Sequence, residues 1–178
     1  NGLIHKNIIN ITNLLQNPSM EHLVLNKNEI LISNVLKNNN YTNYFVGKWH
    51  LGEKNGYRPL ERGFHESLSF LYGASMYGEE KDKNIVSAEI TKSLYDTYMS
   101  KWLPFGISHN NKKMFKPNEY MTDYLSKKVV NIIKNEHNSP YPFFITLAYN
   151  APHNPYQALK SDYILETGGH NEKVYKAM

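Results

Sequence analysis

Residues 41–52 read Tyr-Thr-Asn-Tyr-Phe-Val-Gly-Lys-Trp-His-Leu-Gly. The first six are rich in residues that favour strands, so they predict a short β-strand that runs into Gly47. Just before them, apolar residues at helical spacing predict a helix over 29–37, which the polar run 38–40 ends. After them, the turn-forming residues of 53–63 predict a reversal, and 67–72 predict a second short strand.

The later part of the chain repeats the order of helix and then strand. After Pro117 and Asn118, one apolar stripe predicts a second helix; it consists of Met121, Leu125, Val129, Ile132 and Ile133. The almost continuously apolar run 143–149 predicts a strand covered on both faces. This alternation is typical of an α/β fold with a largely parallel sheet.

Between these parts, residues 74–117 have an irregular pattern, which predicts an insertion or a long loop. No repeat or linker divides the chain, so we expect residues 1–178 to form a single unit without an internal boundary.

Composition excludes several classes of protein. With 40% hydrophobic and 20% charged residues the chain is globular, and no apolar run approaches the ~20 residues of a membrane span. The net charge of +4 is spread along the chain, which indicates a mildly basic surface and no nucleic-acid partner. There is no cysteine, so disulfides and thiolate metal sites are excluded. Asn10 and Asn40 stand in N-glycosylation sequons.

Reactive side chains follow both of the main predicted strands. Lys48 and His50 lie in the loop after the first strand, and His153 lies between two prolines in the loop 150–155 after the second. Ligands of open α/β sheets bind beyond the carboxyl ends of the strands. If the two strands share a sheet, these three side chains emerge at the same edge.

A lysine and two histidines suit an anionic group. Lysine supplies a compact positive charge, and imidazoles donate to an oxyanion or transfer protons near neutral pH. The combination favours an oxyanion ester hydrolase that acts on a sulfate or phosphate ester.

Each residue also has a structural interpretation. Lys48 fits an ordinary surface lysine, His50 and His153 fit loop histidines bonded to the backbone, and Trp49 fits a packing residue. A zinc site built with the other histidines, His65, His109 and His170, lacks the close helical spacing of a metal motif.

The sequence GKWHLG at 47–52, followed by PLERGF at 59–64, resembles the second signature of the sulfatase family. The segment 142–155 is similar to the strand-and-histidine segment of that family, and GLIH at 2–5 resembles the GLxH of its arylsulfatase B-like branch. These segments occur in family order over most of the chain, and the resemblance is weakest between 74 and 117.

The resemblance implies that residues 1–178 are the central part of a sulfatase catalytic domain, an alkaline-phosphatase-like α/β/α sandwich. Such enzymes cleave sulfate esters with a formylglycine nucleophile and a calcium ion. Lys48 matches the lysine that contacts the sulfate oxygens. His50 matches the histidine beside the nucleophile, and His153 matches the one near the bridging oxygen. The resemblance also implies a sulfated small molecule or glycan as substrate and a lysosomal or secreted location.

The chain departs from the family pattern in several places. It contains no C-x-P-x-R or S-x-P-x-R sequence, no acidic calcium segments and no second sulfate-binding lysine, and His65 replaces the usual aspartate of Gly-Phe-Asp. We therefore expect a fragment truncated at both ends, incomplete in its sandwich and inactive by itself. Two alternatives stay open for the parent protein, namely a phosphodiesterase or phosphonate hydrolase of the same superfamily and a non-catalytic relative that binds sulfated glycans.

Overall fold

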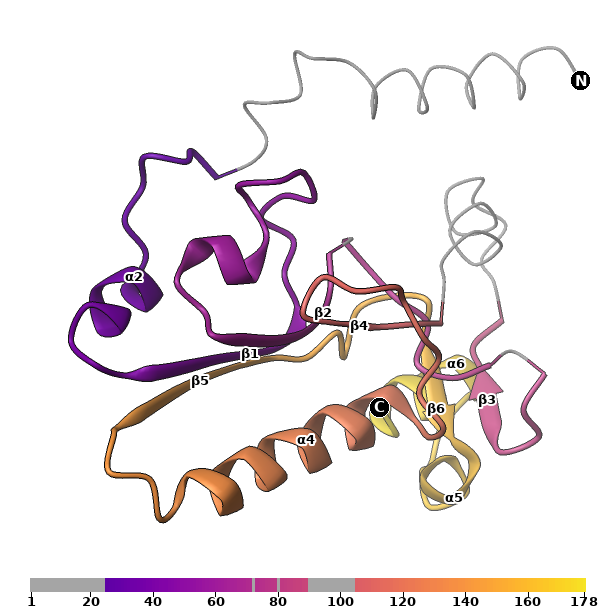
Figure 1. The fold of residues 1–178 in the computed structure, drawn as a ribbon. Coiled ribbons are helices and arrows are strands. Elements are labelled where there is room, and N and C mark those ends of the chain that lie inside the picture. The colour runs from indigo at the N-terminus through magenta and orange to yellow at the C-terminus, as the bar shows by residue number, and fades with distance from the viewer. Residues whose placement is uncertain (1–24, 72, 80, 90–104) are drawn as a thin grey trace, which may run out of the picture.

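The chain folds around a four-stranded sheet with the strand order β4-β2-β1-β5 (Figure 1). The computed structural model describes residues 25–71, 73–79, 81–89 and 105–178. The strands are β1 (Thr42–Lys48), β2 (Glu66–Phe70), β4 (Ser108–His109) and β5 (Phe143–Ala148). β1 pairs in parallel with both β2 and β5, and β4 adds an antiparallel edge. The predicted α/β class with a mostly parallel sheet is confirmed.

Helices cover the two faces of this sheet, as Figure 1 shows. On one face lie α2 (Ile32–Lys37) and the 3-10 turn η2 (Pro59–Arg62), and on the other lies α4 (Met121–Glu136). The sheet has a hydrophobic core on each of its two faces, and successive residues of β1 pack into one core and then the other, because side chains alternate across a strand. Phe45 packs with Trp49 and Phe64, whereas Val46 belongs to the larger core that includes Leu125 of α4.

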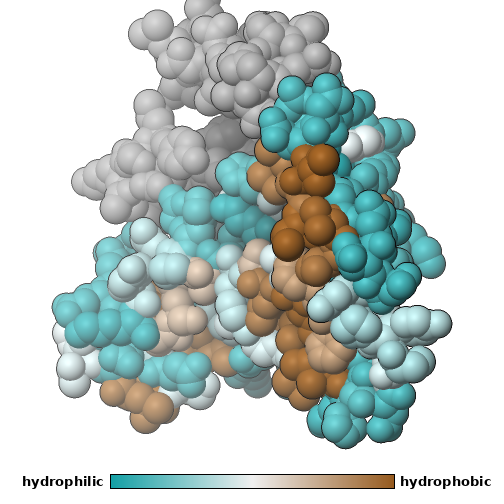
Figure 2. Space-filling model, turned by 90° about the vertical axis from the view of Figure 1, so that its left-hand side faces the viewer, coloured by the Kyte–Doolittle hydropathy of each residue, from teal (hydrophilic) through white to brown (hydrophobic). Residues whose placement is uncertain are grey.

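Strand β5 is less covered than its sequence predicts. All six of its residues are only half-buried, which corrects the expectation of a strand covered on both faces. The physical reason is its place at the edge of the sheet, where β1 is its single strand neighbour among the described residues. Apolar side chains of the flanking helices are exposed as well, including Val35 on α2 and Ile133 on α4. Figure 2 shows a band of hydrophobic residues down one side of the molecule.

The region 74–117 contains more structure than a long loop. Strand β3 (Ile85–Ser87) pairs with β6 (Gln157–Leu159) in a small antiparallel sheet, beside α5 (Lys160–Tyr163) and α6 (His170–Lys176). Residues 74–78 are buried, and Ile107 belongs to the larger core. The expected irregular insertion is therefore wrong for these segments, whereas residues 80 and 90–104 lie outside the described part.

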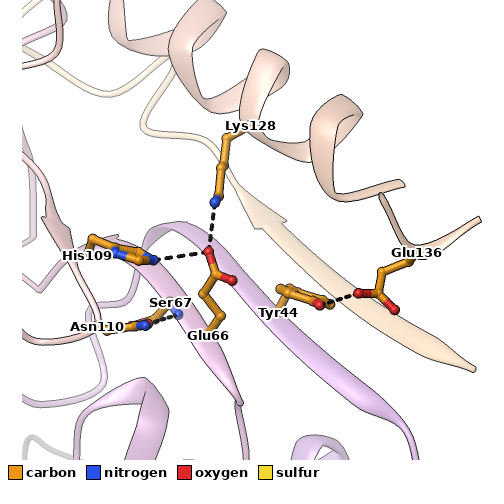
Figure 3. Close-up of polar contacts among 7 residues, drawn as sticks. All are labelled: Tyr44, Glu66, Ser67, His109, Asn110, Lys128 and Glu136. Carbon is orange, nitrogen blue, oxygen red and sulfur yellow. Dashed lines mark hydrogen bonds and ion pairs between the residues drawn. The ribbon is translucent and has the colours of Figure 1, made fainter. Parts of the chain in front are cut away.

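A polar network attaches α4 to the sheet (Figure 3). An Oε1 atom of Glu66 accepts hydrogen bonds from Lys128 Nζ at 2.7 Å and from His109 Nε2 at 3.0 Å. Nearby, the Tyr44 hydroxyl donates to Glu136 at 2.6 Å. Glu66 begins β2, so the network lies toward the amino end of this strand.

The longest described helix, α4, has 16 residues, and no helix of the described residues is apolar and long enough to cross a bilayer.

Candidate functional site at the carboxyl ends of β1 and β5

The two loops that carry the predicted site residues leave the same edge of the sheet. β1 and β5 are parallel neighbours, with Val46 beside Leu147 and Gly47 beside Ala148. Lys48 is the last residue of β1, and the loop 150–155 follows β5 two residues after the strand ends. Lys48 therefore ends β1 itself and does not lie in the loop after it, which corrects the sequence prediction, whereas His50 and His153 follow adjacent parallel strands.

Gly47 allows this close approach of the two strands. Its φ of 112° lies in the region that favours glycine. A Cβ at this position would overlap the carbonyl oxygen of Ala148 and would lie 2.7 Å from its carbonyl carbon. The first glycine of GKWHLG is therefore required by the strand contact as well as by the turn.

Trp49 anchors the loop that separates Lys48 from His50. Its ring is 5% exposed and meets Phe45 edge-on at 4.9 Å, and its indole Nε1 donates to the carbonyl of Tyr57 at 2.7 Å. The packing role predicted for Trp49 is confirmed. Because Trp49 is fixed in the core, the positions of its two neighbours are restricted.

Lys48 is half-buried and carries a positive charge that no acidic group of the described residues neutralises in an ion pair. Burial lowers the pKa of its ammonium group, because desolvation disfavours the charged form. An anionic ligand would relieve this cost, so the position suits an oxyanion.

His50 is electrostatically coupled to both other residues. His50 is exposed, yet partial desolvation of its ring is the main cause that lowers its pKa, and the positive charges of Lys48 and His153 lower this pKa further. His50 is thus within electrostatic reach of both Lys48 and His153. The main chain of Gly73 lies against the imidazole, since a Cβ on Gly73 would be 3.0 Å from Nε2 of His50.

His153 is held by its backbone and by its ring. Its N–H donates to the carbonyl of Asn150 at 2.8 Å, and its carbonyl accepts a hydrogen bond from the Tyr77 hydroxyl at 2.8 Å. Its ring Nδ1 lies 2.6 Å from the carbonyl oxygen of Asn154. A carbonyl can only accept, so Nδ1 carries the proton and Nε2 is left for a ligand.

Comparison with known proteins places this arrangement in a family. A family model described as Sulfatase matches residues 11–173, which is most of the chain. This chain belongs to the sulfatase family.

Individual relatives agree with this placement. The mouse (Mus musculus) N-acetylgalactosamine-6-sulfatase is 30% identical over 136 residues, which are 73% of this chain and 24% of that protein. The arylsulfatase of Klebsiella aerogenes is 26% identical over 140 residues, covering 78% of this chain and 27% of that enzyme. The chain thus spans about a quarter of the length of these curated relatives.

Solved structures give the same result. The crystal structure of Ps i-CgsB in complex with k-i-k-neocarrahexaose matches with a TM-score of 0.70 and 31% identity, over 87% of this chain and 34% of that one. The putative sulfatase yidJ of Bacteroides fragilis matches with a TM-score of 0.60 at 17% identity, over 86% of this chain and 37% of that one, and supports the fold alone. The sulfatase neighbours bear out the predicted alkaline-phosphatase-like architecture.

The described residues of this sulfatase chain do not fit a calcium site. Within the part of the chain that the structure describes, no group of three or more His, Asp or Glu side chains is arranged to hold a metal ion. The 178 residues also contain no cysteine from which a formylglycine could be made. Among the described residues, the candidate site consists of one lysine ammonium group and two imidazole rings.

His65, His109 and His170 make contacts of their own within the described residues. His65 precedes β2, where its Nδ1 accepts from the N–H of Asn43 at 3.0 Å, so it lies at the opposite end of that strand from the site edge. His109 belongs to the network around Glu66, and Nε2 of His170 lies 3.0 Å from the carbonyl oxygen of Ser87.

Of the two asparagines in glycosylation sequons, Asn40 is exposed, whereas Asn10 lies outside the described residues.

Sequence reasoning missed the segment 73–78, which lies behind both histidines of the site. Gly73 contacts His50, the carbonyl of Ser75 accepts from the amide of Asn150 at 2.8 Å, and Tyr77 holds His153. The last two of these contacts join residues 75 and 76 positions apart, so no local sequence pattern indicates them. The available signal was a cluster of small and aromatic residues between Gly73 and Gly78 in a region taken as irregular.

Proposed function

We propose that this chain supplies the sulfate-binding and proton-transfer groups of a sulfuric ester hydrolase. The observation that carries the proposal is the placement of Lys48, His50 and His153 at the carboxyl ends of two adjacent parallel strands of a sulfatase-family fold. The arrangement combines one charge without an acidic partner among the described residues and two imidazoles, which is suitable for a tetrahedral oxyanion.

Lys48 binds the oxygens of the sulfate group in this proposal. Its charge is partly desolvated and unneutralised within the described residues, so the interaction with an anion is stronger than at an exposed lysine. Charge that develops on the sulfate oxygens during ester cleavage is stabilised by the same ammonium group.

His50 would accept a proton from the hydroxyl group of a formylglycine hydrate, which these 178 residues do not supply. Its lowered pKa favours the neutral imidazole, which is the form a general base requires. A proton held by His50 after this step is favoured to leave again, because Lys48 repels it.

His153 donates to the bridging oxygen of the departing alcohol. The carbonyl of Asn154 holds the proton on Nδ1, so a protonated imidazole presents its second proton on Nε2. That proton passes to the alcohol as the S–O bond breaks, and the neutral ring with Nδ1–H is left.

The formylglycine nucleophile and the calcium ligands of the family belong, in our proposal, to residues beyond these 178. A sulfated glycan or a sulfated small molecule is the substrate class that fits, supported by relatives named as an N-acetylgalactosamine-6-sulfatase and an arylsulfatase. The exposed Asn40 sequon and the family resemblance support a lysosomal or secreted location for the parent protein.

The test uses the longer protein that contains this chain, with a chromogenic aryl sulfate as substrate. Lys48→Ala should lower kcat/KM by roughly 100-fold or more, as expected for loss of one charge-stabilising group. Lys112→Ala, a change at an exposed lysine of the same charge, should leave kcat/KM within about twofold. Equal losses at both lysines would contradict the assignment.

The same assay separates the alternatives. Faster turnover of an aryl phosphodiester or phosphonate than of the sulfate would favour the superfamily hydrolase. Binding of a sulfated glycan without any turnover would favour the non-catalytic relative. The isolated 178-residue chain should show no turnover, because it contains no C-x-P-x-R or S-x-P-x-R sequence in which the nucleophile could form.

A further inference from the structure

A buried tyrosine fixes the backbone of the loop that carries His153. Tyr77 is fully buried, and its hydroxyl donates to the carbonyl oxygen of His153 at 2.8 Å, across 76 positions of sequence. The other backbone group of His153 bonds locally, to Asn150. The hydrogen bond from Tyr77 is thus the long-range constraint on this residue among the contacts described.

We propose that Tyr77 is a positioning residue for His153: its hydroxyl sets the peptide plane that orients the imidazole toward the leaving alcohol. This inference rests on the proposed function, because it assumes that His153 donates a proton to the bridging oxygen. Tyr77 itself does not touch the substrate and acts through the carbonyl of His153.

Tyr77 is held rigidly enough to serve this purpose. Its N–H donates to Oε1 of Gln157 at 2.9 Å, and its carbonyl accepts from the N–H of Met121 at 2.8 Å. Its ring stacks on Tyr120 at 5.8 Å between centroids and an interplanar angle of 23°. Because the backbone and the ring of Tyr77 are both fixed in the core, its hydroxyl has a defined position. The hydrogen bond from this hydroxyl therefore fixes the backbone of His153 relative to the core.

The hydroxyl remains a donor over the working range of pH. Burial raises the pKa of Tyr77 far above its ordinary value, so the phenol stays protonated in neutral and mildly alkaline solution. A carbonyl acceptor also matches only the protonated form. The constraint on His153 is therefore constant while the histidines of the site titrate.

The consequence is specific to the departing group. A misplaced proton donor slows the release of a basic alkoxide or phenoxide, but it matters little for an acidic nitrophenol that leaves without protonation. Loss of the Tyr77 hydroxyl should therefore make the rate depend more steeply on the leaving group. A general loss of stability would instead lower both rates by the same factor.

The experiment compares kcat for 4-nitrophenyl sulfate and phenyl sulfate in the longer protein that contains this chain. In Tyr77→Phe the ratio of the two rates should rise about tenfold, a fraction of what full general acid catalysis contributes. The ratio is measured on one preparation, so it does not depend on the folded fraction. Phenylalanine keeps the ring and its stacking, and the loss of one hydrogen bond is small against the stability of a domain.

Tyr120→Phe is the matched control. Tyr120 is also a buried tyrosine, and its hydroxyl donates at 2.7 Å to the carbonyl of Gln157, four residues beyond His153. Its removal should leave the ratio unchanged, whereas His153→Ala should raise it more than Tyr77→Phe does.

The outcomes separate the two proposals. A raised ratio in His153→Ala with an unchanged ratio in Tyr77→Phe would overturn the role of Tyr77 and leave the role of His153 intact. An unchanged ratio in His153→Ala would overturn both. An equal rise in Tyr77→Phe and Tyr120→Phe would reduce Tyr77 to general support of the loop, which also contradicts the inference.

Discussion

Replacing Gly47 by alanine tests whether the site depends on the close approach of β1 and β5. Gly47 has a φ of 112°, and its Cα faces the backbone of Ala148 on the neighbouring strand. The atoms that an added Cβ would meet are the carbonyl oxygen, carbon and nitrogen of Ala148, which are all backbone. Backbone in a paired strand cannot turn aside as a flexible side chain does, so the two strands must separate locally.

The cost has two parts. The left-handed backbone conformation costs an alanine roughly 1–2 kcal/mol relative to glycine. The overlap with Ala148 adds about 1–3 kcal/mol, as measured for overpacking in other proteins. Gly47→Ala should therefore lower the free energy of unfolding by about 2–5 kcal/mol, a large part of the ~5–15 kcal/mol that stabilises a typical domain.

Gly169→Ala supplies the control for this substitution. Gly169 has a φ of −69°, and a Cβ there would meet no atom within 4 Å. Its replacement should change the free energy of unfolding by less than about 1 kcal/mol, because two effects oppose each other. Alanine reduces the conformational entropy of the unfolded chain, which stabilises the fold, but it is a poorer helix N-cap than glycine. Urea unfolding, followed by fluorescence, measures both variants. A loss below ~1 kcal/mol for Gly47→Ala, or equal losses for both variants, would refute the argument from strand contact.

Two further predictions concern titrating groups. In a histidine NMR titration, Lys48→Met should raise the pKa of His50 but keep it below 6.5, because desolvation is the larger cause of the lowered value. An unchanged pKa of His50 would contradict the electrostatic coupling of the two side chains. Burial alone would raise the pKa of Glu66, but hydrogen bonds from Lys128 and His109 outweigh it and lower the pKa below 4.5. The stability that this ionised carboxylate contributes is present above pH 4.5 and is lost as the pH falls through the folded pKa. Glu66→Gln should therefore make the free energy of unfolding decrease less steeply in acid. An equally steep decrease in that variant would show that Glu66 is not its source.

The sequence predicted those parts of the fold that short-range patterns determine. The apolar stripe from Met121 to Ile133 gave helix α4, and the β-formers before Gly47 gave β1. The strand at 143–149 was found, but its burial was wrong, because an apolar run does not tell whether a strand has neighbours on both sides. Burial depends on the sheet order, which is a long-range property.

The same distinction applies to the site. The placement of Lys48, His50 and His153 at one edge of the sheet could be predicted, because the carboxyl ends of neighbouring parallel strands meet at that edge. Tyr77 could not, because its role depends on a hydrogen bond to a carbonyl 76 residues away. Backbone carbonyls have no residue identity, so a sequence carries no sign of which one is bound.

Each of the two loops that carry the candidate site residues is constrained at two points. Each leaves a strand of the sheet, and each is fixed a second time by a buried aromatic side chain: Trp49 donates to the carbonyl of Tyr57, and Tyr77 donates to that of His153. The pairing of the strands therefore brings the two loops to the same edge of the sheet, and the aromatic side chains fix the orientation of the loop residues there. It follows that damage at Gly47 should appear mainly as lost stability, whereas loss of the Tyr77 hydroxyl should appear mainly as altered chemistry in a protein that still folds.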